Sequence, residues 1–254
     1  MTSFKREAER DVQSALFPMS VLMNDAPKVT QRTLQKRSQG YKDTFNGRLL
    51  KGLTLARPYD IPILEPCRTV PSKLVAFSEA VRAGRQDADA WVHFYEDDFR
   101  FERFWNEPEK TLERLDGFAG LIGPDFSLYE NMPTAQKIRN TYRNQLLSAW
   151  AQKRGVQVIA NVRLSGSESI PYSLAGIPTN STIAFGLHGC LQNTENRRQV
   201  VQGMVLACDH LLPNNVLIYG SDAYRVADAA HERNIPVHVY EPDTWQRSHE
   251  RSVA

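Results

Sequence analysis

Residues 91–129 read WVHFYEDDFRFERFWNEPEKTLERLDGFAGLIGPDFSLY. This stretch contains two apolar runs of strand length, 91–95 and 118–122, and each is followed by acidic residues. Between them, a proline at position 108 begins a helical pattern that extends to about residue 115. Strand, helix and strand in this order are typical of a parallel sheet whose crossover connections are helices. The stretch therefore predicts an α/β fold with acids at the ends of its strands.

The same alternation continues on both sides of this stretch. Further strands are expected at 61–65, 156–162, 182–187, 216–219 and 237–240, and further helices at 72–81, 133–153, 196–210, 221–232 and 243–251. Near-continuous apolar strands are typical of a parallel sheet covered by helices. We predict a parallel (β/α) barrel-like domain of about seven strands, with a doubly wound open sheet as the alternative.

Composition places the chain among ordinary globular proteins. Of its 254 residues 41% are hydrophobic and 24% charged, and no apolar run approaches the roughly 20 residues that cross a bilayer. The N-terminus lacks the apolar region of a secretory signal. The three cysteines are far apart without CxxC spacing, which indicates free thiols rather than a zinc site. We expect a cytoplasmic protein without a membrane segment.

The first 58 residues differ from the rest in charge and pattern. Residues 1–60 contain eleven Lys and Arg against six Asp and Glu, a net charge of +5, so the remaining chain carries −3 of the total of +2. Helical fragments are expected only near 3–16 and 30–37. We interpret 1–58 as a basic arm or packing cover on a barrel-like domain at 59–254. The arm is either a solvated surface segment or a contact for nucleic acid or an acidic partner.

Carboxylates after the second and third expected strands are the main candidates for chemistry, because the carboxyl ends of parallel strands form the ligand face. Glu96, Asp98 and Asp125 are predicted catalytic residues, one of which a neighbouring charge would keep protonated as a general acid. Asp97, Asp98 and Asp125 are the predicted ligands of a possible Mg²⁺. Alternation along a strand lets at most two of residues 96–98 point at one site. The alternative is that these acids cap turns and pair with Arg100 and Arg103.

Basic and polar residues near the same ends of the strands are candidates for substrate binding. They are Arg68, Arg100, Arg139, Arg143, Arg163 and Ser221. Arg139 and Arg143 lie one turn apart near the start of the longest expected helix and could hold a phosphate or carboxylate. Ser221 lies at a strand-to-helix junction where free backbone N–H groups suit a phosphate. His188 could act as a base or metal ligand, whereas His93 lies within a strand and is interpreted as a core residue.

Five sequence blocks resemble a known family. They are FYEDDFRFERFWNEP at 94–108, GPDFSLY with the MP that follows at 123–133, RNTYR at 139–143, GVQVI at 155–159 and LIYG at 217–220. In order and spacing they are similar to the blocks of a family of domains of unknown function, number 4417 in its series (DUF 4417). The likeness covers about residues 90 to 240. Where the family has a Trp-Ser pair, this chain has Arg163-Leu164-Ser165. The resemblance implies a phage or mobile-element setting but no reaction.

Two kinds of function remain open from the sequence. The first is a carboxylate-dependent enzyme, with or without Mg²⁺, that acts on an anionic, nucleotide-related substrate. The alternative is a non-catalytic accessory protein that binds nucleic acid or a host protein, or a structural component that assembles through the arm. No GxSxG, HExxH, P-loop or GxGxxG motif is present, which argues against serine hydrolases, zincins and P-loop nucleotide enzymes.

Overall fold

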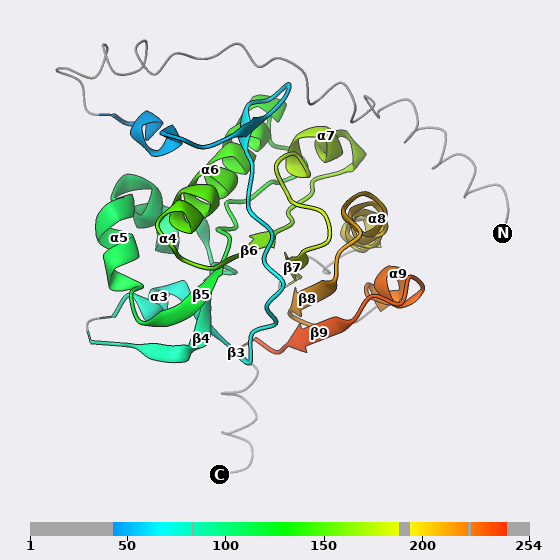
Figure 1. Ribbon diagram of the computed structural model, residues 1–254. Helices are drawn as coiled ribbons and strands as arrows, with labels where there is room; N and C mark the ends of the chain where they lie inside the picture. The colour runs from blue at the N-terminus through cyan, green and yellow to red at the C-terminus, as the bar shows by residue number, and fades with distance from the viewer. Residues whose placement is uncertain (1–42, 83, 188–193, 223–224, 243–254) are drawn as a thin grey trace, which may run out of the picture.

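The computed structural model describes residues 43–82, 84–187, 194–222 and 225–242 (Figure 1). The helices expected at 3–16, 30–37 and 243–251 lie outside the described residues, as do His188 and Cys190.

A seven-stranded parallel sheet forms the centre of the molecule. Each strand pairs with the next one along the chain, so the spatial order equals the sequence order. The strands are β3 (Lys73–Ala76), β4 (Asp87–His93), β5 (Phe118–Ile122), β6 (Val158–Asn161), β7 (Thr182–Gly186), β8 (Asn215–Tyr219) and β9 (Val237–Tyr240). The sheet curls into a half-barrel (Figure 1), as the barrel-like prediction requires.

The two edge strands of the half-barrel do not pair with each other. Among the described residues β3 and β9 have one sheet neighbour each. The curl nevertheless brings the end of β9 to the chain just before β3, where the Tyr240 hydroxyl donates a 2.6 Å hydrogen bond to the carbonyl of Pro71. The sheet is thus neither a closed barrel nor the doubly wound open sheet considered as the alternative.

Alternation along the strands separates an inner face from an outer face. The inner residues Trp91, Ile122, Ile159, Ala184 and Leu217 form one buried cluster, into which Cys67 also packs. The strand residues next to them in sequence point outward and pack under helices, because successive side chains of a strand point to opposite faces. The side chains of this cluster therefore fill part of the inside of the half-barrel.

Helices cover the outer face in two groups. Beneath β3 to β6 lie α4 (Asp98–Asn106), α5 (Pro108–Arg114) and α6 (Thr134–Lys153), and beneath β6 to β9 lie α8 (Thr194–Leu211) and α9 (Asp228–His231) (Figure 1). Short turns of helix, α3 (Phe77–Ala80), α7 (Ile170–Ser173), η2 (Gly47–Leu50) and η3 (Ser167–Ser169), occur in the connections. α6 supplies Leu146, Leu147 and Trp150 to the first group's core.

The chain before β3 closes the amino end of the half-barrel. A hairpin of β1 (Leu55–Ala56) and β2 (Ile61–Pro62) leads into an extended segment, 63–71. This segment crosses the amino end of β7, where the carbonyl of Cys67 accepts a 2.7 Å hydrogen bond from Thr182 N. Residues 43–58, the described part of the expected arm, pack on the body, with Leu49 buried and Lys153 Nζ 2.9 Å from the carbonyl of Gly52.

The expected elements differ from the observed ones at four places. The strand expected at 61–65 is wrong, because only Ile61–Pro62 is a strand and it belongs to the hairpin. The helix expected at 72–81 is wrong, because Lys73–Ala76 pairs with β4 and only Phe77–Ala80 is helical. The helix α4 was not predicted, although Phe101, Phe104 and Trp105 have helical spacing and are buried. Beyond β8, the described helix is limited to Asp228–His231.

Candidate functional site

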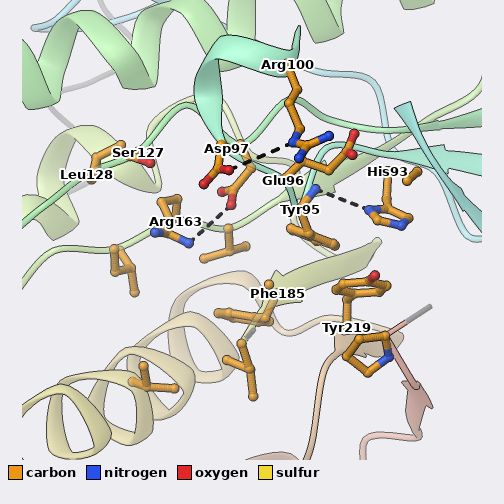
Figure 2. A pocket seen from close by; sticks show the side chains of 18 of the residues that line it. His93, Tyr95, Glu96, Asp97, Arg100, Ser127, Leu128, Arg163, Phe185 and Tyr219 are labelled. Atoms are coloured by element: carbon orange, nitrogen blue, oxygen red, sulfur yellow. Dashed lines mark hydrogen bonds and ion pairs between the residues drawn. The ribbon is translucent and has the colours of Figure 1, made fainter. Parts of the chain in front are cut away.

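A cavity of about 880 Å³ opens at the carboxyl ends of the strands (Figure 2). Every strand of the sheet contributes to its lining, either with its last residue or with the loop that follows. The polar and aromatic lining residues include Ser78, Glu79, Arg82, His93, Tyr95, Glu96, Asp97, Arg100, Asp125, Ser127, Tyr129, Arg163, Gln199 and Tyr219. This is the end of a parallel sheet where ligands bind in half-barrel and barrel folds. The opposite end is closed by residues 63–71.

Asp125 and Arg163 form an ion pair in the wall of this cavity. Asp125 follows β5 and is 7% exposed, and its Oδ2 lies 3.1 Å from Arg163 Nη1, whose side chain follows β6. Burial raises the pKa of the Asp125 carboxyl, while Arg163 and a hydrogen bond from Asn161 act in the opposite direction without cancelling it. The result is a buried carboxyl group that protonates at a higher pH than an ordinary aspartate.

Two further residues fix the orientation of the Asp125 carboxylate. Asn161, the last residue of β6, donates from Nδ2 to Asp125 Oδ1 at 2.8 Å and to the carbonyl of Pro124 at 3.2 Å. Its Oδ1 accepts a 3.1 Å hydrogen bond from the Tyr95 hydroxyl. Burial also raises the pKa of Tyr95, so its hydroxyl remains a donor. The carboxylate is thus held at both oxygens by Asn161 of β6 and Arg163 of the loop after it, and Tyr95 orients Asn161.

Three rings from β4 and β8 stack below these polar groups. Tyr219 lies 4.2 Å from His93 and 5.1 Å from Tyr95, measured between ring centroids. His93 accepts a hydrogen bond from Tyr95 N at Nδ1, 3.2 Å, and burial lowers its pKa to about 3, so the imidazole is neutral. Gly186 permits this stack, because a Cβ at that position would overlap the Tyr95 ring. His93 is buried, as the sequence predicted, and it also lines the cavity.

The three consecutive acids after β4 have different surroundings. Glu96 accepts hydrogen bonds from Ser78 N, 2.8 Å, and Ser78 Oγ, 2.5 Å, and lines the cavity. Asp97 also lines it, with a side chain that is 73% exposed and 3.9 Å from Arg100 Nε. Asp98 is turned away and accepts from Ser127 N and Oγ, because α4 begins at this residue. Two of the three acids thus face the site, which is the maximum expected from the sequence.

The expected substrate-binding residues are divided between the cavity and other places. Arg100 and Arg163 line the cavity. Arg143 is buried beneath it, 3.5 Å from the Phe126 ring centroid and 2.5 Å from Glu102, where it joins α6 to α4. Arg139 is exposed on α6, and Ser221 is half-buried after β8, and neither is among the lining residues.

Arg68 lies at the closed, amino end of the sheet, where its Nε donates to the carbonyl of Asn180, 3.3 Å. The sequence placed Arg68 at the rim because residues 61–65 were expected to be the first sheet strand. In the structure those residues are a hairpin strand and the start of the segment that closes the amino end. Arg68 is therefore separated from the cavity by the length of the strands.

The described residues contain no group of three His, Cys, Asp or Glu side chains arranged to hold a metal ion. Asp98 is directed at Ser127, so Asp97, Asp98 and Asp125 do not point at one place. Sequence reasoning missed Ser78, Tyr95 and Tyr219. The residues 91, 93 and 95 alternate toward one face, so the inward direction of Tyr95 was available from the pattern once Trp91 was taken as buried.

A family described as "Domain of unknown function (DUF4417)" matches residues 53–236, which include the hairpin and the strands β3 to β8. The chain belongs to this family. The DUF4417 match ends at the residue before β9, so β9 and the lining residue Pro242 lie beyond it.

Two curated phage proteins are similar to this DUF4417 chain. The "Gene 1 protein" of Mycobacterium phage D29 is 29% identical over 223 residues, which are 83% of this chain and 78% of the relative. The "Gene 1 protein" of Mycobacterium phage L5 is 32% identical over 163 residues, 64% of this chain and 71% of the relative. No solved structure gives a significant match. Among the described helices, none combines the length and apolar character needed to cross a bilayer.

Proposed function

We propose that this DUF4417 protein binds an anionic, nucleotide-related small molecule in the cavity and acts on it through the Asp125 carboxyl group. The observation that carries the proposal is the buried Asp125–Arg163 pair in the wall of an 880 Å³ cavity. A buried carboxyl with a raised pKa, next to a specific charge partner in a cleft, is the usual signature of acid–base chemistry.

The lining supplies the contacts that each part of a nucleotide needs. Arg163 and Arg100 can receive phosphate or carboxylate oxygens, and the guanidinium group suits such oxygens because it donates two parallel hydrogen bonds. Tyr219 offers an aromatic side chain on the cavity lining for a planar base. Glu96 is a second carboxylate, held by Ser78, that could accept a proton while Asp125 gives one.

We propose that Mg²⁺ binds in the cavity together with the phosphates of the substrate. Asp97 and Asp125 both line the cavity, and the phosphates of a nucleotide provide oxygen ligands that Mg²⁺ prefers. The buried, free thiols of Cys67 and Cys208 suit a reducing compartment, and we place the activity in the cytoplasm on this basis.

Calorimetric titration with nucleoside mono-, di- and triphosphates, each with and without Mg²⁺, tests the proposal. Arg163→Gln and Asp125→Asn are expected to weaken the best ligand by at least about tenfold, since each removes a charge-assisted contact or its partner. Arg48→Gln is the matched control, because Arg48 is also paired with a carboxylate, Glu109, but lies outside the cavity.

Turnover is followed with the same nucleotides by chromatography. Loss of turnover in Asp125→Asn at nucleotide concentrations that saturate its weakened site would support a catalytic carboxyl. Binding without turnover in the parent protein would instead favour the non-catalytic accessory reading. Equal binding by the parent and both cavity variants would contradict the proposed site.

A further inference from the structure

Two large aromatic side chains are exposed beside residues that line the cavity. Tyr129, in the loop after β5, is 59% exposed and lines the cavity, and Phe99, the second residue of α4, is 74% exposed and precedes the lining residue Arg100. Scattered exposed aromatics need no explanation, but two that adjoin one cavity differ from that pattern.

The backbone beneath the two rings is fixed. Asp98, next to Phe99, accepts hydrogen bonds from Ser127 N at 3.1 Å and Ser127 Oγ at 2.8 Å. The carbonyl of Ser127, two residues before Tyr129, accepts a 2.8 Å bond from Asn140 Nδ2 on α6. These contacts join the start of α4, the loop after β5 and α6 into one rim. A platform that is already ordered costs little entropy when it binds.

Charged groups of both signs accompany the rings. The Arg100 guanidinium lies 5.5 Å from the Phe99 ring centroid, and Arg139 is exposed one residue before Asn140. Asp97 and Glu130 also line the cavity. The rim therefore has cations for a phosphate backbone without being strongly basic, so any polyanion bound here would be held by stacking as much as by charge.

We infer that the ligand of the cavity is one nucleotide of a single-stranded nucleic acid, whose neighbouring bases stack on Phe99 and Tyr129. This inference rests on the proposed nucleotide-binding function of the cavity and adds the class of polymer. Stacking on exposed rings requires unpaired bases with free faces, which a duplex does not offer. Arginine beside an aromatic platform is the combination that single-strand binding surfaces use.

Fluorescence anisotropy with labelled oligothymidylate and oligouridylate of about 12 nucleotides tests the inference on the full chain. Phe99→Ala and Tyr129→Ala are each expected to weaken oligonucleotide binding about tenfold, and Phe99→Ala, outside the cavity lining, should leave thymidine monophosphate binding unchanged. Phe45→Ala is the matched control, because Phe45 is 78% exposed but is not part of the cavity rim. Any contribution from residues 1–42 is the same in all variants and cancels in the comparison.

Two further measurements are independent of the variants: the dependence of affinity on salt concentration, and the affinity for single-stranded compared with duplex nucleic acid. We expect a shallow dependence of affinity on salt concentration and a clear preference for the single strand over the matching duplex. Equal affinity for the duplex, or rim variants that bind the oligonucleotide as the parent does, would overturn the inference while leaving the cavity's proposed function intact. Oligonucleotide binding that depends on Phe99 and Tyr129 but is unchanged in Asp125→Asn and Arg163→Gln would overturn the cavity function and leave only the stacking surface.

Discussion

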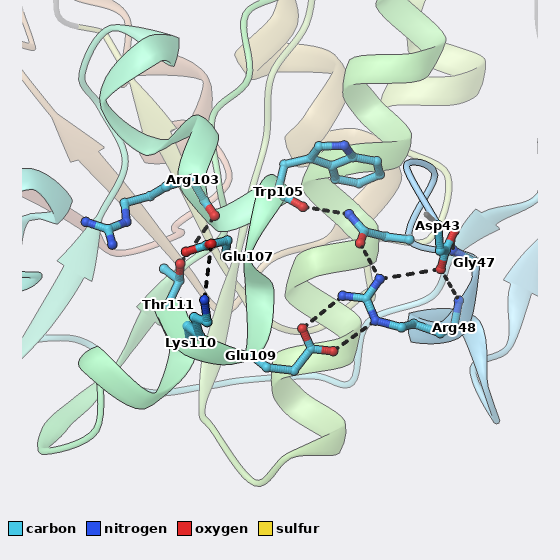
Figure 3. A network of polar contacts seen from close by, with 10 residues as sticks. Asp43, Gly47, Arg48, Arg103, Trp105, Glu107, Glu109, Lys110 and Thr111 are labelled. Atoms are coloured by element: carbon cyan, nitrogen blue, oxygen red, sulfur yellow. Dashed lines mark hydrogen bonds and ion pairs between the residues drawn. The ribbon is translucent and has the colours of Figure 1, made fainter. Parts of the chain in front are cut away.

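Two arginine–carboxylate ion pairs with similar N–O distances lie in very different surroundings. Arg48 contacts Glu109 at 2.9 and 3.1 Å on the outer cover (Figure 3), where the two side chains are 44% and 40% exposed. Arg163 contacts Asp125 at 3.1 Å in the cavity wall, where the Asp125 side chain is 8% exposed. The hydrogen bond from Arg48 lowers the pKa of Glu109, whereas burial raises the pKa of Asp125 despite its arginine.

The different surroundings show which of the two ion pairs stabilises the fold. The outer pair keeps its water and gains a little from attraction, so it adds slightly to stability. The inner carboxylate has lost its water, and its arginine and amide partners compensate for only part of that loss. Packing alone would favour an uncharged side chain at this position, and the proposed function of the cavity would account for a carboxyl there.

The cavity also contains a titratable group, His93, that has no equivalent beside the outer pair. We expect its titration to have the largest effect on the free energy of unfolding. Burial lowers the pKa of His93 to about 3, below the 6.5 of the unfolded chain, so the unfolded state binds the extra proton between these values. The free energy of unfolding should therefore fall as pH drops below 6.5, by up to about 1.4 kcal/mol per pH unit.

The replacement His93→Phe keeps a ring beside Tyr219 and removes the titration. Its urea-unfolding curves, measured from pH 7 to pH 4, should show less acid destabilisation than the parent, although at pH 7 it loses about 1 kcal/mol with the hydrogen bond from Tyr95 N. Parallel pH profiles for the two proteins would show that His93 is not held neutral.

Removing one arginine from each pair gives the next largest effect. Arg163→Gln leaves the buried Asp125 carboxylate without its cation and should lower the free energy of unfolding by about 3 kcal/mol at pH 7. Arg48→Gln should cost about 1 kcal/mol or less, because its partner remains hydrated. Chemical denaturation of both variants measures the two losses, and equal losses would remove the contrast between the pairs.

Two glycines of the cavity lining test how tightly the site is packed. Gly186→Ala places a Cβ against the Tyr95 ring, which packs on both His93 and Tyr219, and should destabilise by about 2 kcal/mol. Gly203→Ala, in the helix α8, meets only the terminal Leu164 Cδ1 at 2.9 Å, and the added helix propensity should offset the small shift. Thermal denaturation measures both, and a tolerated alanine at 186 would show that the ring stack can move.

Replacing the two carboxylates should give the smallest effects, with opposite dependence on pH. The folded-state pKa of Asp125 is raised, so its charge opposes folding above pH 3.8, and Asp125→Asn should gain stability relative to the parent as pH rises from 4 to 7. The folded-state pKa of Glu109 is lowered, so its charge favours folding above pH 4.5, and Glu109→Gln should lose stability over the same range. The interpretation would be contradicted if the stability of both variants, relative to the parent, changed in the same direction between pH 4 and pH 7.

The sequence predicted the parts of the fold that have strong, uninterrupted patterns. The strand at 118–122 and the helix at 133–153 were found to within a residue, because one is a compact apolar run and the other has five turns of regular spacing. The segment 72–81 was misassigned because Leu74, Phe77 and Val81 have helical spacing, while pairing with β4 holds its first half as a strand. A four-residue strand joined to a four-residue helix is too short for periodicity to separate.

The candidate site was predictable in position and only partly in composition. Acids and arginines after successive strands meet in one cavity because all seven strands are parallel, so Glu96, Asp125 and Arg163 come together. The roles of Asp98 and Arg143 depend on α4, which was not predicted from the sequence. Asp98 accepts hydrogen bonds from Ser127, and Arg143 pairs with Glu102 outside the lining. Asn161 and Tyr95 act through hydrogen bonds between strands, which depend on register and leave no local pattern.

The strictly sequential strand order has a consequence for synthesis on the ribosome. Each new strand can dock on the one made just before it, so the sheet can grow from β3 onward with contacts between near neighbours in the chain. The cavity, however, takes its last lining residues from Tyr219 and Pro242. A nascent chain that has not yet reached these residues would have a partly assembled sheet and an incomplete cavity, so the lining is complete only after Pro242 has been added.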